Sequence, residues 1–299
     1  MTGAGDQEET ADQANAGAAS DAQLEGVMRL LGDDSFISLT VRKSQARELA
    51  EAEDWAGAAT LYARLLPAVL RVHGPDHPDA LDTRNNLIRC QGEAGDWAAS
   101  AVAFVGLLDD VRRVYGPKHP LTLATWSNLA HARGKAGQAA VAAADFEELI
   151  PLVRRVYGRS HVETFTVRGR RAMWRGKAGN AVAAVAAFVD LLNDMERVFG
   201  PNRAVFSIRH ELAHWQGAAG DATGAAAAYA DLLHDQQRVL GPDHPDISET
   251  INALTRWRGE ADDAAGAAAV RAEIARIRHS AGPGPLRRWW RTVGKGSRR

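Results

Sequence analysis

The stretch Gly74-Pro75-Asp76-His77-Pro78 decides the fold, because variants of it return along the chain at a fixed interval. The spacing is 42 residues and shortens by one at the last copy; the later copies begin at Gly116, Gly158, Gly200 and Gly241. A second mark recurs between these copies at the same period: Gly95-Asp96, Gly137-Gln138, Gly179-Asn180 and Gly220-Asp221. A fixed period of about 20–50 residues is typical of a solenoid. The repeat therefore predicts an extended surface suited to holding a partner.

One repeat, residues 80–115, reads as two helices joined by a tight turn. Asp96 is a natural N-cap for the second helix, Gly116 is expected to end it with a positive φ angle, and Pro117 prevents its continuation. The second half places apolar residues at the i, i+3, i+4, i+7 spacing of an amphipathic helix; these are Phe104, Leu107, Leu108, Val111 and Val114. Each period is therefore predicted to be helix, turn, helix and linker.

Four positions of the second helix recur and are predicted to form the core. The aromatic position holds Tyr62, Phe104, Phe146, Phe188 and Tyr229, and four residues earlier a small residue stands at Ala58, Ser100, Ala142, Ala184 and Ala225. A leucine position holds Leu65, Leu107, Leu149, Leu191 and Leu232. A valine position near the helix end, which we also expect in the core, holds Val72, Val114, Val156, Val198 and Val239.

The chain is accordingly predicted to be an all-α, right-handed α-solenoid of about six helix pairs. The pairs are expected at residues 39–73, 77–115, 119–157, 161–199, 203–240 and 245–279, with a short capping segment near 24–31. Residues 1–22 are predicted to be a disordered acidic segment, 23–280 the solenoid and 281–299 a basic tail. In the last pair Arg271 replaces the core aromatic, as expected where a solenoid ends in water.

These features resemble the tetratricopeptide repeat, in which a small residue and an aromatic residue four positions later mark the second helix. The 42-residue period, the Gly-Pro-Asp-His-Pro linker and Asn-Asn-Leu at residues 85–87 are similar to the kinesin-light-chain variant, and such arrays occur in actinobacterial proteins. The resemblance covers about residues 39–279. It implies a non-enzymatic protein-interaction scaffold that holds a peptide or helical segment in a concave groove lined by the first helices.

Carried over residue by residue, the resemblance gives a set of groove candidates. They are Asn85, Arg89, Ser127, His131, Lys135, Met173, Lys177, His210, His214, Asn252 and Arg256. Asn85 and Asn252 match the asparagine that holds a peptide main chain in the family, whereas Ser127, Gly169 and His210 depart from it. Because the face carries several cations, the expected partner is an acidic protein or peptide across the second to fifth pairs. The sequence leaves self-association open.

Two other interpretations compete with the scaffold. The first is a sensor module that binds a small anionic ligand or nucleic acid, with the tail residues Arg287, Arg288, Trp289, Trp290 and Arg291 docking on a membrane or nucleic acid. The second is a zinc hydrolase, since His210-Glu211-Leu212-Ala213-His214 matches H-E-x-x-H. Against zinc, the third ligand of the longer motif falls on Gly220, and His214 occupies the repeat position of His131.

The remaining composition fits an ordinary soluble protein. The net charge is −1, there is one cysteine, and no apolar run is long enough for a membrane span. The N-terminal residues lack the basic and apolar regions of a secretory signal. We therefore expect a cytoplasmic protein without a cofactor, in which Cys90 is structural and the linker histidines His77, His119, His161 and His244 act as caps.

Overall fold

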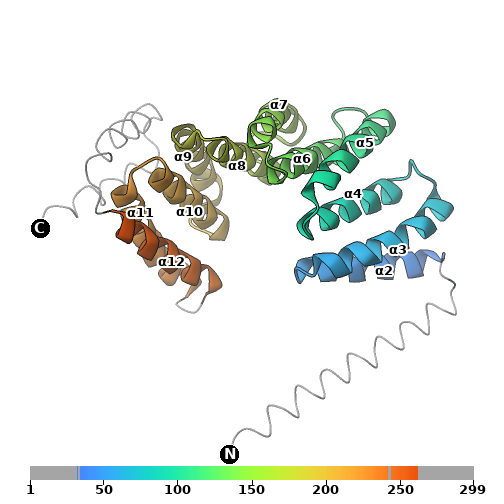
Figure 1. The fold of residues 1–299 in the computed structure, drawn as a ribbon, viewed down its shortest axis with the longest axis horizontal. Helices are drawn as coiled ribbons and strands as arrows, with labels where there is room; N and C mark the ends of the chain where they lie inside the picture. Colours follow the sequence, from blue (N-terminus) through green and yellow to red (C-terminus); the bar gives the residue numbers. More distant parts are fainter. Residues whose placement is uncertain (1–31, 33, 242–243, 262–299) are drawn as a thin grey trace, which may run out of the picture. The chain divides into compact units, whose positions relative to one another are not determined.

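The computed structural model describes residue 32 and residues 34–241 and 244–261, and every secondary-structure element in this part of the chain is an α-helix (Figure 1). Its helices are α2 Phe36–Glu51, α3 Trp55–His73, α4 Pro78–Glu93, α5 Trp97–Tyr115, α6 Pro120–Lys135, α7 Ala139–Tyr157, α8 Val162–Lys177, α9 Ala181–Phe199, α10 Arg203–Ala218, α11 Ala222–Leu240 and α12 Pro245–Glu260. The predicted all-α class and helix pairs are confirmed, with α2 beginning three residues earlier than expected. None of the described helices is long and apolar enough to cross a membrane.

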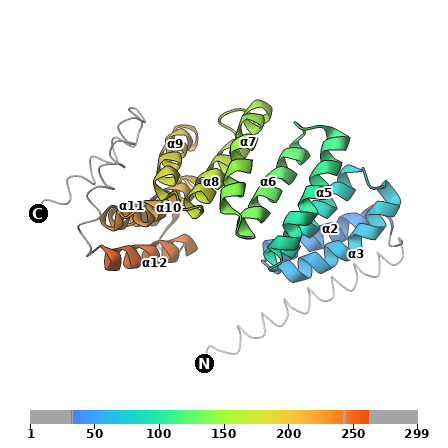
Figure 2. The ribbon, with the colours of Figure 1, turned by 45° about the horizontal axis from the view of Figure 1, so that its top comes forward.

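The chain divides into two units. The first, Met1–Gly116, contains α2–α5, and the second, Pro117–Arg299, contains α6–α12. Within each unit, consecutive helices pack side by side, as Figure 2 shows for α6–α12. The predicted acidic segment, the second helix of the sixth pair and the basic tail lie outside the described residues.

The linker histidines are N-caps, as predicted. His77, His119, His161 and His244 each precede a first helix, and each Nδ1 atom accepts a hydrogen bond from the backbone N–H two residues on, at 3.2–3.3 Å. Because the first N–H groups of a helix have no partner within it, such a cap stabilises the helix start. The four histidines therefore have a structural role.

Asp96 and Gly116 mark the start and the end of α5 as predicted. The Asp96 carboxylate accepts from the Ala99 backbone N–H at 3.0 Å, which caps α5. At the other end of α5, Gly116 takes φ 81° and ψ 170°, a backbone conformation that favours glycine. The periodic glycines thus determine where the helices stop.

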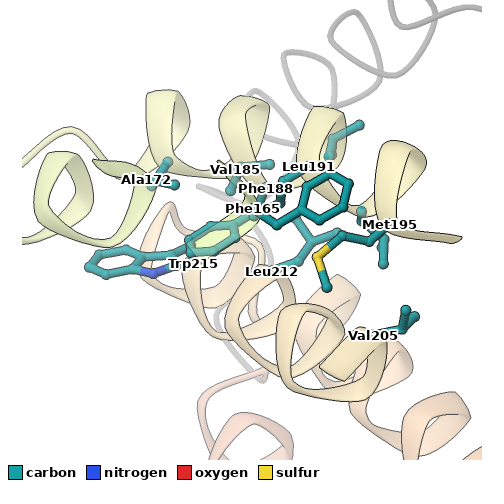
Figure 3. Packing of buried hydrophobic residues seen from close by; sticks show 12 residues of the cluster. Phe165, Ala172, Val185, Phe188, Leu191, Met195, Val205, Leu212 and Trp215 are labelled. Atoms are coloured by element: carbon teal, nitrogen blue, oxygen red, sulfur yellow. The ribbon is translucent and has the colours of Figure 1, made fainter. Parts of the chain in front are cut away.

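The second helices bury their aromatic, small and leucine positions. Tyr62, Phe104, Phe146, Phe188 and Tyr229 are each at most 2% exposed. Figure 3 shows one such core, in which Phe188 and Leu191 of α9 pack with Phe165 of α8 and Leu212 of α10. Three of the four predicted core positions are therefore confirmed.

The valine position was predicted wrongly. Val72, Val156, Val198 and Val239 are between 36% and 45% exposed, and Val114 is half-buried. At 100° per residue, Val111 lies within about 20° of Phe104 around the helix, whereas Val114 lies about 80° away. The core position is three residues earlier, at Val69, Val111 and Val153, which are buried.

Candidate functional site

The first helices of the second unit form one layer, and pairs of residues join each helix to the next. Arg170 of α8 donates a hydrogen bond to the Ser127 hydroxyl of α6 at 2.9 Å. Trp174 of α8 packs on Gly134 of α6, so closely that a Cβ atom on the glycine would lie 2.5 Å from the indole ring. Equivalent contacts join α10 to α8 and α12 to α10; they are Trp215 on Gly176 and Trp257 on Gly217.

Three predicted groove residues gather with Arg170 on this layer. His131, Lys135, Lys177 and Arg170 interact electrostatically: burial and then the charges of Arg170, Lys135 and Lys177 lower the pKa of His131 to about 4. His131 is therefore neutral at neutral pH, while Lys135 and Lys177 are exposed. The Lys177 ammonium lies 4.9 Å from the centre of the Trp174 ring. This arrangement makes a cationic surface.

The layer continues along α10 and α12. Burial lowers the pKa of His214, and the charges of Arg256 in α12 and Lys177 in α8 lower it further, although Glu211 opposes them. His214 thus lies within electrostatic reach of both neighbouring first helices. We give the name first-helix face to the side of α6, α8 and α10 that carries Ser127, His131, Lys135, Arg170, Met173, Lys177, His210 and His214.

An apolar pocket opens on this face between α8, α9 and α10. Its volume is about 540 Å³. It is lined mainly by Val162, Phe165, Met173, Phe188, Met195, Phe199 and Ile208, with Thr166, Arg170, Asn202, Ser207 and Glu211 as polar members. Gly169 also lines it, at the repeat position held by Asn85, Ser127, His210 and Asn252. Because glycine has no side chain, nothing at this position fills the pocket.

Comparisons with known proteins agree with this geometry. The family model of the tetratricopeptide repeat matches residues 205–246, which include most of α10 and all of α11. The fold is that of a tetratricopeptide-repeat array of the kinesin-light-chain-like type. A putative kinesin light chain from Podosopora anserina, with nearly identical TPR-like repeats, is 17% identical with a TM-score of 0.58, over 67% of this chain and 95% of that one.

A second solved structure covers more of the array. BtubC (BKLC) from P. vanneervenii is 18% identical with a TM-score of 0.53, over 83% of this chain and 92% of that one. Comparison with curated proteins gave no match. At these identities the likeness concerns the fold, and a tetratricopeptide array is a fold suited to a protein-interaction scaffold.

In the first unit of the array, the predicted groove residues have a different setting. Asn85 is only 7% exposed, and the Arg89 guanidinium lies 5.4 Å from the centre of the Trp55 ring. Nearby, Lys43 of α2 pairs with Asp79 at 3.3 Å and Asp82 at 2.7 Å of α4. Lys43 is therefore held by two carboxylates of α4.

Asn252 and Arg256 lie on α12, the last first helix of the described array. Both side chains are exposed. Arg256 bonds to Glu260 at 3.0 Å and stacks 4.7 Å from the centre of the Trp257 ring. Their role in holding a ligand stays a prediction.

The side chains of the H-E-x-x-H motif contact aromatic residues. The His210 ring meets Tyr229 edge-on at 4.9 Å, and the His214 ring lies against Trp215 and Trp257. The Glu211 carboxylate accepts a hydrogen bond from the Trp215 indole at 3.1 Å. Among the described residues, no three His, Cys, Asp or Glu side chains gather as metal ligands would. The repeat structure accounts for the motif without zinc.

Four of the five basic residues of α8 separate into two sets. Arg168 pairs with Asp194 at 2.8 Å, and Arg171 pairs with Glu147 at 2.8 Å. Arg171 stands in a leucine position of the core, so its stem lies along apolar surface while its guanidinium reaches the carboxylate. Arg170 and Lys177 face α6 instead. Only part of the basic run therefore contributes to the first-helix face.

Sequence reasoning missed two features of the face. One is the pocket beside Gly169, although the glycine was visible as a departure at the groove position. The other is one position of the first helix that holds the small residues Cys90 and Ala132 in the earlier repeats and Trp174, Trp215 and Trp257 in the later ones. The glycines that receive these rings recur at the same period, which was a readable signal.

Proposed function

We propose that this chain is a non-enzymatic scaffold whose first-helix face binds an acidic segment of a partner protein. The observation that carries the proposal is the cationic surface around the neutral His131. Helix α6 contains no Asp or Glu, and α8 contains only Glu163, in its first turn. A surface with this charge attracts acidic ligands and raises their rate of association.

The pocket beside Gly169 supports a peptide ligand over a small anion. Its lining is apolar, and Arg170 and Glu211 line it as charged groups. An apolar side chain of the bound segment would be removed from water there, while neighbouring acidic residues meet Arg170 and Lys177. Burial of one such side chain contributes roughly 1.5–3 kcal/mol. Charge then provides selectivity and the pocket provides affinity.

The test begins with selection of peptides from a random display library on the immobilised full-length chain. Affinities of the selected peptides are then measured by fluorescence anisotropy at low and moderate salt. Because exposed ion pairs contribute only about 0–1 kcal/mol each, Lys135→Ala and Lys177→Ala should each weaken binding by up to about fivefold. Both should also flatten the salt dependence. Arg64→Gln, an exposed cation of α3 in the other unit, is the matched control and should change nothing.

Gly169→Leu separates pocket binding from folding. A Cβ atom at Gly169 would make only ordinary contacts, at 3.5 Å to Leu191 and 3.9 Å to Ile208. The variant should therefore stay helical while its side chain fills the pocket and weakens the selected peptides. Selected peptides without acidic residues would contradict the proposal. Affinities that are unchanged in all three variants but abolished by trimming residues 286–299 would move the function to the tail.

A further inference from the structure

The charge pairing of the repeat is broken at the end of α7. In the first two repeats, an arginine in the last turn of the second helix is held by a linker aspartate. Arg71 bonds to Asp34 at 2.7 and 3.2 Å, and Arg113 bonds to Asp76 at 2.6 and 2.9 Å. One repeat after Arg113 and Asp76, the equivalent positions hold Arg155 and Lys118. The linker partner has been replaced by a like charge.

A second acidic position is lost at the same place. Asp110 lies 3.5 Å from Arg113, and its later equivalents Asp194 and Asp235 lie 3.4 and 3.0 Å from Arg197 and Arg238. In α7 this position is Leu152. Within the described residues, Arg155 is thus the member of the series that has neither acid. The helix dipole favours a cation in the last turn of any helix, so it does not explain why Arg155 alone lacks an acid. The other four arginines of the series also lie in a last turn, and each is paired.

Two further arginines, Arg154 and Arg159, lie close to Arg155 in the sequence. Arg159 replaces the proline that follows the linker glycine in the other copies. The ion pair of Glu147 with Arg171 sets the register of α7 against α8, which brings Arg154 beside the first turns of α8.

Like charge surrounds Arg154. Burial and then Arg168, Arg159 and Arg171 lower the pKa of Arg154, and Asp194 is the acid that opposes them. Asp194 already pairs with Arg168, and Glu147 with Arg171. The nearest other acids in sequence are Glu148 of α7 and Glu163 in the first turn of α8.

We propose that Arg154, Arg155 and Arg159, with Lys118, form a binding site for one phosphorylated side chain of a protein partner. Arginine forks match phosphate oxygens bidentately, and a phosphoryl group carries nearly two negative charges at pH 7. The four cations come from one helix end and the two linkers that flank α6 and α7, which suits a single dianion. A nucleic-acid backbone needs a longer track of cations, and along α8 Arg168 and Arg171 already pair with acids. This site does not depend on the first-helix face.

The test uses two degenerate peptide libraries that share a fixed central position, phosphoserine in one and serine in the other. The full-length chain should bind the phosphoserine library at least about tenfold more tightly, as expected for charge-assisted hydrogen bonds. Arg155→Gln and the double variant Arg154→Gln/Arg159→Gln should lose most of this preference. Arg64→Gln should keep it, which excludes a simple effect of net charge.

Lys118→Asp places an aspartate at the position equivalent to Asp76, which holds Arg113 in the preceding repeat. The new carboxylate is expected to pair with Arg155 in the same way. It should abolish the preference for phosphoserine while leaving the melting temperature unchanged or higher, so the loss cannot come from unfolding. Equal binding of both libraries by the wild-type chain would overturn the proposal. A preference for phosphoserine that survives in the arginine variants would also overturn it. So would a chain that shows no phosphopeptide preference but binds a 20-nucleotide RNA or phosphatidylserine vesicles, if the arginine variants abolish that binding.

Discussion

The contact between Gly134 and Trp174 predicts an unusual outcome for a glycine-to-alanine change within a helix. In an exposed helix interior this change stabilises by about 0.5–1 kcal/mol. At Gly134, however, the new Cβ atom would lie 2.5–2.6 Å from three atoms of the Trp174 ring. The ring is buried and cannot move without displacing its neighbours. Overpacking of this kind costs about 1–3 kcal/mol, so Gly134→Ala should be net destabilising by about 1 kcal/mol or more.

Two controls are built into the chain. Gly259 holds the same repeat position as Gly134 and Gly106 lies within α5, and a Cβ atom on either meets nothing within 4 Å. Gly106→Ala should raise the midpoint of urea unfolding, and Gly259→Ala should not lower it, while Gly134→Ala lowers it. Trp174→Leu in the Gly134→Ala background should recover part of the loss, as a double-mutant cycle measures. A Gly134→Ala chain as stable as the Gly259→Ala chain would refute the proposed packing.

Three further outcomes follow from the same contacts. Phe146→Ala should cost about 3–5 kcal/mol in urea unfolding, because it empties a fully buried aromatic position, and a loss below about 1 kcal/mol would contradict the repeat phasing. Asp96→Ala should cost about 1 kcal/mol through loss of the α5 cap, whereas Asn in place of Asp96 should cost little. Since the pKa of His131 is held at about 4, the unfolded chain takes up a proton first as the pH falls below about 6.5. Stability present above pH 6.5 should therefore fall between pH 6.5 and 4 by up to about 3 kcal/mol, and His131→Gln should remove that part of the slope.

Sequence periodicity predicted the helix boundaries and most of the core because those depend on local chemistry. Glycine, aspartate and histidine at the linkers end and cap helices wherever they stand, and the aromatic at Phe146 is buried by the helix's own pattern. The valine position failed because the recurrence of a residue shows that a position is equivalent between repeats, not that it faces the core. The angle of Val156 around the helix decided its exposure.

The candidate site was less predictable because it depends on contacts between repeats. Whether the gap above Gly134 is filled by Trp174 cannot be read from either residue alone. The same holds for Arg168 and Arg171, whose partners lie on α9 and α7 rather than on their own helix. Gly169 was visible as an exception, but its effect on the surface needed the side chains of three helices around it.

Photo-crosslinking tests most directly whether the ligand lies on the first-helix face. A benzophenone amino acid is placed at Thr166, an exposed residue of α8 that lines the pocket, and in a second protein at Val156, which is exposed on α7. The proposed function predicts that a selected acidic peptide is trapped from position 166 and not from position 156, and that unlabelled peptide competes. Trapping from position 156 alone, or from neither position while the peptide still binds, would contradict it.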